Sequence, residues 1–238
     1  MSRSRFRYIK EVFRFDDIDT RDERKTPENQ GKLAPISKIF DLFLDACSVN
    51  FSPGRDLTVD ESIDAFKGRC SFKIFMPSKP DRYGIKIWSM VDSKTSYLWN
   101  AEIYQGKTSN KRETGQAERV VKQLVKGRGE QTIEHTGRTI TADNFFTSVK
   151  LAKYLLNAGV SFLGTLRKNK PEIPQCFQAS KERIPYSTEF GFSKQERMMI
   201  SSYVPKKNKA VLMLSTKHYD KETEDTPPHK PKTILDYN

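Results

Sequence analysis

The order of strand-like and helix-like segments between Leu57 and Arg167 constrains the fold of this chain more than any other feature. A short, partly apolar strand at 57–62 precedes two longer strand-like runs across 83–106, which are joined by a polar turn at 92–95. Helical spacing of apolar residues then alternates with strands, in the ranges 114–126, 138–143, 148–158 and 160–166. Three consecutive strands followed by alternating helices and strands predict an α/β fold with a mixed sheet.

Local signals at the helix ends support this order. Thr114 is placed to cap the first of the two helices, and Thr147 or Ser148 to cap the second, which Gly159 ends. The inward residues of the first helix are predicted to be Ala117, Val120, Val121, Leu124 and Val125. This succession of elements is that of an RNase H-like fold.

Two amphipathic helices are predicted before the strands begin. The first spans residues 3–14 and carries arginines around an apolar face. Pro35 opens the second helix. The apolar faces comprise Phe6, Ile9, Val12 and Phe13 in the first helix, and Ile36, Ile39, Phe40, Phe43 and Cys47 in the second.

The pattern weakens beyond Arg167. Short strands are predicted within 190–216, as a separate region, and a polar, proline-containing segment at 220–232 predicts a solvated loop. Residues 233–237, TILDY, predict a strand that has just begun.

The charge balance bounds the kind of partner. Lysine and arginine number 42 against 30 aspartate and glutamate, which gives a net charge of +12 and a pI near 9.5. This favours a polyanionic partner, although charge alone does not separate DNA from RNA or a membrane surface. No apolar run is long enough to cross a bilayer, so no membrane partner is expected. The three cysteines and three histidines lack disulfide or zinc spacing, which predicts reduced thiols and structural histidines.

Two aspartates stand out within the predicted sheet. Asp60 lies inside the strand LTVDES, and Asp143 ends the strand RTITAD. Two strands that pair in a sheet can hold two carboxylates closer together than flexible loops can. Most aspartates near strand ends form turns or helix caps, and that alternative stays open for Asp143. Glu61 and Asp64 lie near Asp60, but strand alternation turns Glu61 to the other face, so Asp60 is preferred.

Converging carboxylates are typical of metal-dependent phosphodiester chemistry. Two metal ions about 3.5 to 4 Å apart can activate an attacking oxygen, neutralise a leaving oxygen and hold both in line. Hard cations such as Mg²⁺ take oxygen ligands. We therefore predict Asp60 and Asp143 as catalytic, metal-binding residues.

Three phrases of the sequence resemble the piggyBac family of DNA transposases: DLTVDESIDAFKGRCSFKIFMPSKPDRYGIKIW, TITADNFFTSVKLAKYLL and GTLRKNKPEIP. The resemblance implies a nuclear, cut-and-paste transposase that uses Mg²⁺, cleaves the ends of transposon DNA and inserts at TTAA sites, with a possible homodimer. Asp60 and Asp143 correspond to two of the three metal-binding aspartates of that family.

The same resemblance implies a division of the chain into four parts. These are a partial helical dimerisation and DNA-binding region at 1–55, an incomplete RNase H-like catalytic core at 56–168, a small β-containing insertion domain at 169–228, and the start of a returning core strand at 229–238. The family's third aspartate lies in a Gly-Gly-Val-Asp segment beyond Asn238, and Asp236 is not expected to replace it. The chain is thus expected to be a fragment or a catalytically incomplete copy; the alternatives are a domesticated, non-catalytic DNA-binding or chromatin-associated protein and an unexpressed relic.

Basic residues near Asp60, and those of the basic segment 105–130, are candidate DNA contacts. They are Lys67, Arg69, Lys79, Arg82, Lys107, Lys111 and Arg112. For the helix within 105–130, a solvated outer face is an equal alternative. Aromatic residues are interspersed in the basic segment 165–209, where a place in the core is more common than a base-stacking role. They are Phe177, Tyr186, Phe190, Phe192 and Tyr203.

Overall fold

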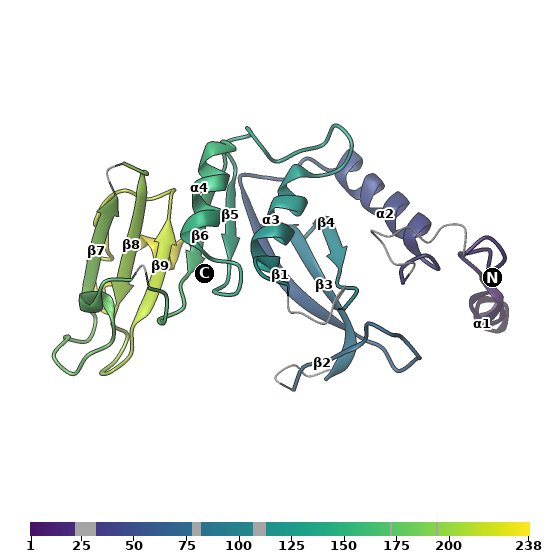
Figure 1. Cartoon of the computed structure of the whole chain (residues 1–238), viewed down its shortest axis with the longest axis horizontal. Coiled ribbons are helices and arrows are strands. Elements are labelled where there is room, and N and C mark those ends of the chain that lie inside the picture. The colour runs from purple at the N-terminus through teal and green to yellow at the C-terminus, as the bar shows by residue number, and fades with distance from the viewer. Residues whose placement is uncertain (22–31, 78–81, 107–112, 172, 194) are drawn as a thin grey trace.

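The computed structural model describes residues 1–21, 32–77, 82–106, 113–171, 173–193 and 195–238. Within these ranges nine strands form one mixed sheet in the order β2-β3-β1-β5-β6-β9-β8-β7, with β4 paired to β3 (Figure 1). The strands are β1 (Asp56–Ala65), β2 (Ile74–Phe75), β3 (Tyr83–Asp92), β4 (Leu98–Ile103), β5 (Thr139–Ala142), β6 (Ser161–Thr165), β7 (Thr188–Ser193), β8 (Met198–Tyr203) and β9 (Val211–Ser215). The helices are α1 (Arg3–Val12), α2 (Ser37–Asn50), α3 (Gln116–Lys126), α4 (Val149–Asn157) and α5 (Lys232–Leu235), with one 3-10 turn at Gln175–Phe177.

The centre of the sheet follows the predicted order. β1, β3 and β4 pair antiparallel in succession, and β5 and β6 then join β1 as parallel strands. The connections through α3 and α4 place helices between strands on one side of the sheet. The predicted α/β fold with a mixed sheet is therefore confirmed.

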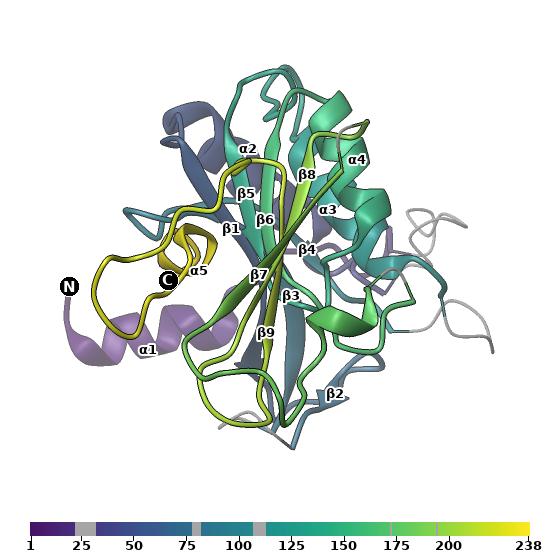
Figure 2. The ribbon, with the colours of Figure 1, turned by 90° about the vertical axis from the view of Figure 1, so that its left-hand side faces the viewer.

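Helices α3 and α4 cover one face of the sheet, as Figure 2 shows. The helices contribute Val120, Leu124 and Leu151 to a core that also holds Leu57 and Val59 of β1. All five side chains are fully buried. The predicted inward face of α3 is thus confirmed, apart from Ala117, which is only partly buried.

One of the predicted helix caps is confirmed and one is wrong. The Ser148 hydroxyl accepts a hydrogen bond from the Leu151 N–H at 3.1 Å and so caps α4. Helix α3 begins instead after Gly115, whose φ of +74° places it in the left-handed region that suits glycine, and Thr114 does not cap it. Gly159, with a φ of +66°, ends α4 as predicted.

The final residues form a helical turn rather than the predicted strand. Helix α5 follows Pro231, and its consecutive residues Thr233 and Ile234 are both buried. Successive residues of a strand point to opposite faces, so a single sheet face could not bury both, whereas one turn of helix can. Ile234 packs with Leu163 and Met213 on the face of the sheet opposite α3 and α4 (Figure 2).

The strands predicted beyond Arg167 extend the central sheet. β9 pairs with β6, β8 with β9, and β7 with β8, all antiparallel. The expectation that this part is separate is therefore wrong at the level of the sheet, because backbone hydrogen bonds run continuously from β6 to β7. The division of the chain into functional domains stays a prediction.

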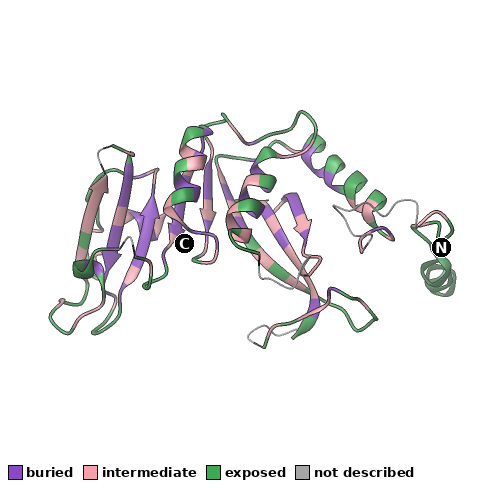
Figure 3. Ribbon diagram, viewed as in Figure 1, coloured by how far each residue is buried: buried purple, intermediate pink, exposed green. Residues whose placement is uncertain are grey.

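The two N-terminal helices expose much of their apolar faces (Figure 3). α1 has no buried residue and lies at the end of the molecule remote from β7 (Figure 1). α2 packs against β4 and buries Leu44, Cys47 and Ser48, whereas Ile39 and Phe43 of the predicted stripe stay exposed. No helix among the described residues is long and apolar enough to cross a membrane.

Candidate active site

Asp60 and Asp143 lie level with each other on neighbouring strands. β1 and β5 run parallel, and their paired register ends with Val59 opposite Ala142, so the next residue on each strand is an aspartate. Val59 and Ala142 are fully buried in the core under the helices. Because side chains alternate along a strand, both carboxylates project from the opposite, more open face of the sheet.

Each carboxylate has one oxygen bound to backbone. Oδ1 of Asp60 accepts from the Glu61 N–H at 2.8 Å, and Oδ1 of Asp143 accepts from the Phe145 N–H at 2.8 Å. The carbonyl of Asp143 also accepts from the Thr147 hydroxyl at 2.8 Å, so Asp143 does form the turn into α4. Within the described residues neither Oδ2 has a partner. The turn role is therefore compatible with a ligand role.

The competing acidic residues lie elsewhere on β1. Glu61 pairs with Trp88, whose side chain is buried in the core under the helices, so Glu61 occupies the other face from Asp60, as predicted. Asp64 shares the face of Asp60 but pairs with Ile85, near the end of β1. β1 and β5 therefore bring together one pair of carboxylates, Asp60 and Asp143.

A row of polar residues continues across the open face. Ser89 of β3 pairs with Asp60 on one side. On the other side β5 and β6 are parallel with Ala142 opposite Gly164, so Thr165 follows at the level of Asp143. The row Ser89, Asp60, Asp143 and Thr165 thus crosses four adjacent strands.

Tyr237 reaches this row from the segment that follows α5. Burial raises the pKa of the Tyr237 phenol, a hydrogen bond with Thr165 acts against this, and the negative charges of Asp143 and Asp60 raise it further. The phenol therefore lies close enough to the carboxylate pair to feel both charges. Sequence analysis missed Tyr237 because it lies in a segment predicted to be a strand, with no spacing that relates it to the aspartates.

A cluster of charged side chains fixes the segment that carries Tyr237. Nε2 of His218 and Oδ2 of Asp236 lie 2.9 Å apart, and Nδ1 of His218 lies 2.8 Å from the Ser215 hydroxyl. Lys217 and Lys232 form ion pairs with Asp236 at 3.3 and 3.2 Å. Burial disfavours the charged carboxylate, but these hydrogen bonds outweigh it and lower the pKa of Asp236 to about 2. Asp236 is thus engaged in holding α5 to β9, which agrees with its exclusion as a third ligand.

A groove of about 810 Å³ lies on the open face of β1 and β5. Thr58 and Thr141 line it, and they lie two residues before Asp60 and Asp143 on the same face of β1 and β5. Its other lining residues include the basic side chains Arg55, Lys94 and Lys217 and the ring of Tyr237. The carboxylates of Asp56, Asp92 and Asp236 line it as well, and Lys217 is ion-paired with Asp56 and Asp236. The groove therefore carries cations, hydroxyl groups and carboxylates together.

The predicted DNA contacts are only partly within the described residues. Lys67, Arg69 and Arg82 are exposed, in the loops next to the far end of β1 and the start of β3. Arg69 also lines a cavity of about 380 Å³ with Phe66 and Phe72. Lys79, Lys107, Lys111 and Arg112 lie outside the described residues.

Cations around α3 are largely paired with carboxylates. Arg119 binds Glu102 at 2.8 Å and Glu113 at 2.7 Å, and Lys122 binds Glu118 at 2.6 Å. Despite burial, these hydrogen bonds raise the pKa of Arg119 above its usual value. The pairs favour the solvated outer face over DNA contact for this helix.

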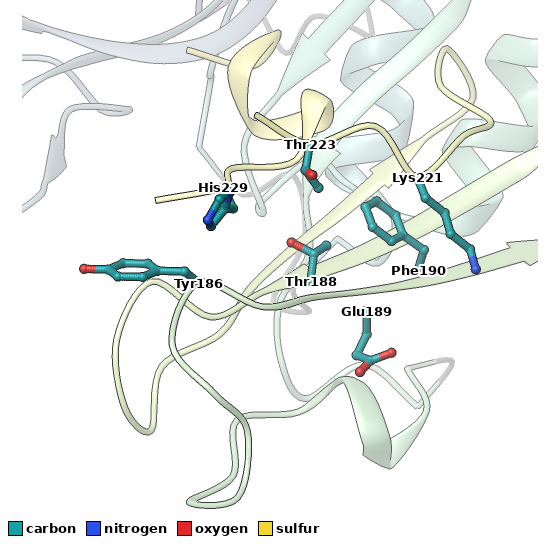
Figure 4. A pocket seen from close by; sticks show the side chains of 7 residues that line it. All are labelled: Tyr186, Thr188, Glu189, Phe190, Lys221, Thr223 and His229. Carbon is teal, nitrogen blue, oxygen red and sulfur yellow. The ribbon is translucent and has the colours of Figure 1, made fainter. Parts of the chain in front are cut away.

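A further cavity of about 380 Å³ lies on the edge strand β7, remote from β1 and β5 in the sheet order. In Figure 4 Thr188 and Phe190 face Thr223 and Lys221, while Glu189 points away from them. Two of the aromatic residues predicted in this region, Phe177 and Tyr203, belong to the core, as expected. Four acidic residues at 220–225 surround Lys221 in sequence, which makes this cavity a poor site for a nucleic acid.

The ligand atoms of the carboxylate pair are of the type that a hard cation prefers. Asp60 and Asp143 supply oxygen ligands, which Mg²⁺ prefers, and each keeps an oxygen without a partner in the described part of the chain. No group of three or more metal-ligating acidic, histidine or cysteine side chains occurs in the described ranges. The pair alone would supply two protein ligands, and a complete metal site would need water or further ligands.

Comparisons with known proteins agree with the fold. The family model described as Transposase IS4 matches residues 1–238. PiggyBac transposable element-derived protein 3 of Homo sapiens is 30% identical over 172 residues, which cover 70% of this chain and 26% of that protein. The chimeric ERCC6-PGBD3 protein of Homo sapiens is likewise 30% identical over 172 residues, covering 14% of its length.

A solved structure matches the whole chain. It is the piggyBac transposase synaptic complex with hairpin DNA, determined by cryo-EM, with a TM-score of 0.87 and 37% sequence identity. The match covers 100% of this chain and 48% of that chain. The chain thus spans about half of the solved protein and about a quarter of the first human relative.

Proposed function

We propose, from the fact that this chain belongs to the piggyBac family of transposases, that it forms the catalytic sheet of a DNA transposase acting by metal-dependent phosphodiester cleavage and strand transfer. One observation carries the proposal. The parallel register of β1 and β5 sets Asp60 and Asp143 level with each other on the open face. Neighbouring strands lie about 4.8 Å apart. That spacing suits two carboxylates that share metal ions.

Asp60 and Asp143 would hold Mg²⁺ through their unpaired oxygens. When bound, Mg²⁺ supplies a Lewis acid that stabilises negative charge on phosphate oxygens. The sheet fixes the spacing of the two side chains, since both follow buried residues of paired strands. The groove beside them would orient the DNA backbone, with Arg55 and Lys94 opposite its phosphates.

The finer features of this function are proposals as well. Cleavage at transposon ends, insertion at TTAA and a nuclear location follow from the family resemblance. Support for DNA as the ligand comes from the net charge of +12 and from a structural neighbour that is a complex with hairpin DNA. The exposed apolar faces of α1 and α2 suit contact with a second copy of the chain.

A second candidate is a non-catalytic DNA-binding or chromatin-associated protein. The specific observation in its favour is that two carboxylates, and no third, converge among the described residues. The groove, with Arg55 and Lys94 among its lining residues, would then bind DNA without cleaving it.

Strand cleavage of DNA bearing the matching transposon ends separates the two functions. We would assay the 238-residue chain and a version extended to the length of the solved relative, each in Mg²⁺. The extended protein is expected to cleave, and Asp60→Asn or Asp143→Asn is expected to abolish this, with Asp64→Asn as the matched control on the same strand face. Binding without cleavage by the extended protein would reject the catalytic proposal in favour of the second candidate.

A further inference from the structure

Tyr237 places a hydroxyl group beside the carboxylate pair. Thr165 stands level with Asp143 in the parallel register of β5 and β6, and the Tyr237 side chain packs against the cluster that contains Leu163, two residues before Thr165 on the same face of β6. The phenol is also near enough to Asp60 to be influenced by its charge. The side chains of Tyr237, Thr165, Asp143 and Asp60, from four segments distant in sequence, thus lie together at one level of the open face.

The position of this phenol is fixed by packing and by charge. The Tyr237 ring packs against a small cluster that includes Leu163, Met213 and Ile234. The preceding residue, Asp236, is held by His218, Lys217 and Lys232. A side chain whose ring and neighbouring backbone are both restrained presents its hydroxyl in one place, as a binding group requires.

Tyr237 adds a further hydrogen-bond donor at the carboxylate pair, besides the hydroxyl groups of Ser89 and Thr165 in the same row. When ionised, the carboxylates of Asp60 and Asp143 accept hydrogen bonds and cannot donate them. An anionic ligand, however, needs hydrogen-bond donors. A phenol is protonated at neutral pH, because its ordinary pKa is about 10. Tyr237 also lines the groove that contains Arg55 and Lys94, together with Thr58 and Thr141, which precede Asp60 and Asp143 by two residues on the same face.

We propose that Tyr237 is a substrate-contacting residue of this site, whose hydroxyl donates a hydrogen bond to a non-bridging oxygen of the DNA phosphate held at Asp60 and Asp143. This rests on the proposed function of the pair. In this arrangement the Thr165 hydroxyl donates a hydrogen bond to the phenol oxygen of Tyr237, which leaves the phenol proton free to point toward the phosphate. No proton is transferred in this role, so the contact serves binding and orientation of the phosphate.

The location of Tyr237 can be tested with Tb³⁺, a hard cation that takes oxygen ligands and emits strongly when a nearby excited tyrosine transfers energy to it. Tb³⁺ added to the 238-residue chain is expected to bind at Asp60 and Asp143 and to show sensitised emission. Tyr237→Phe should reduce that emission several-fold without changing the Tb³⁺ affinity measured by calorimetry. Tyr219→Phe, which changes an exposed tyrosine of the loop after β9, is the matched control and should leave the emission unchanged.

The contact with phosphate is tested by the affinity for a short DNA duplex in Ca²⁺. Tyr237→Phe is expected to weaken binding about three- to tenfold, as the loss of one hydrogen bond to an anion predicts. Thr165→Val should weaken it less, since it only frees the phenol to rotate. Thermal unfolding checks that Tyr237→Phe, which keeps the packed ring, is folded.

The outcomes separate this inference from the function on which it rests. Tb³⁺ binding that is unaffected by Asp60→Asn would overturn both. Binding that requires Asp60, with sensitised emission unchanged in Tyr237→Phe, would overturn only the placement of Tyr237. Reduced emission with unchanged DNA affinity would show that Tyr237 is near the metal site but does not contact the phosphate, which also overturns the inference.

Discussion

Replacing Asp236 with asparagine should destabilise the fold at neutral pH and have little effect in acid. Asp236 is 20% exposed and interacts with His218 at 2.9 Å, Lys232 at 3.2 Å and Lys217 at 3.3 Å. Burial alone would raise its pKa, but these partners lower it from 3.8 to about 2. Without screening, this lowering of the pKa would contribute roughly 2.4 kcal/mol to the free energy of unfolding. Solvent screening at a partly exposed site reduces the contribution to about 1 kcal/mol.

The pH dependence has a definite sign. Because the pKa of Asp236 is lower in the folded than in the unfolded chain, its contribution is complete above the unfolded value of 3.8 and is lost as the pH falls toward about 2. Urea unfolding at a series of pH values measures this directly. The free energy of unfolding of Asp236→Asn should be lower than that of the parent by about 1 kcal/mol at neutral pH, with the gap closing in acid.

Asp225→Asn provides the control, since Asp225 is an exposed residue of the same loop region. It should follow the parent chain at every pH. A gap for Asp236→Asn that stays constant through the acid range, or no gap at neutral pH, would refute the reasoning that the ionised carboxylate holds α5 to β9.

Further predictions concern the helix ends, the core and the binding of DNA. Ser148→Ala should lower the free energy of unfolding by about 1 kcal/mol, while Thr114→Ala should leave it nearly unchanged, because Gly115 and not Thr114 begins α3. Leu124→Ala should cost about 2 to 5 kcal/mol in the same measurement, because Leu124 is fully buried. The logarithm of the affinity for DNA should fall steeply with the logarithm of the salt concentration, and a flat response in a fluorescence titration would exclude phosphate contacts as its source. Arg119→Gln should change that affinity little, since two glutamates already neutralise Arg119, and a large loss would restore α3 as a DNA-binding surface.

The sequence sufficed for those features that depend on local periodicity. Alternation of apolar residues identified β1 and β5, and the strand order made their pairing the natural arrangement of a mixed sheet. Once these strands pair in parallel, the adjacency of Asp60 and Asp143 follows from Val59 and Ala142 lying opposite each other. The predicted exclusion of Glu61 depended on the same alternation.

Features that depend on contacts between distant segments could not be read from periodicity. Lys217 lies 3.3 Å from Asp56 and 3.3 Å from Asp236, a contact set by the return of the chain across the sheet. The sequence predicts a strand where α5 forms, because five residues carry too little periodicity to separate a strand from a helical turn. The place of Tyr237 beside the aspartates depends on both of these features.

Metal binding to single and double variants of the aspartates tests the central claim most directly. If Asp60 and Asp143 form one site, calorimetric titration with Mg²⁺ or Mn²⁺ should show a single class of binding that either Asp60→Asn or Asp143→Asn removes. The double variant should then lose nothing more, and Asp64→Asn should bind as the parent does. Independent and additive losses from the two substitutions, or binding that survives both, would contradict the claim that β1 and β5 build a shared metal site.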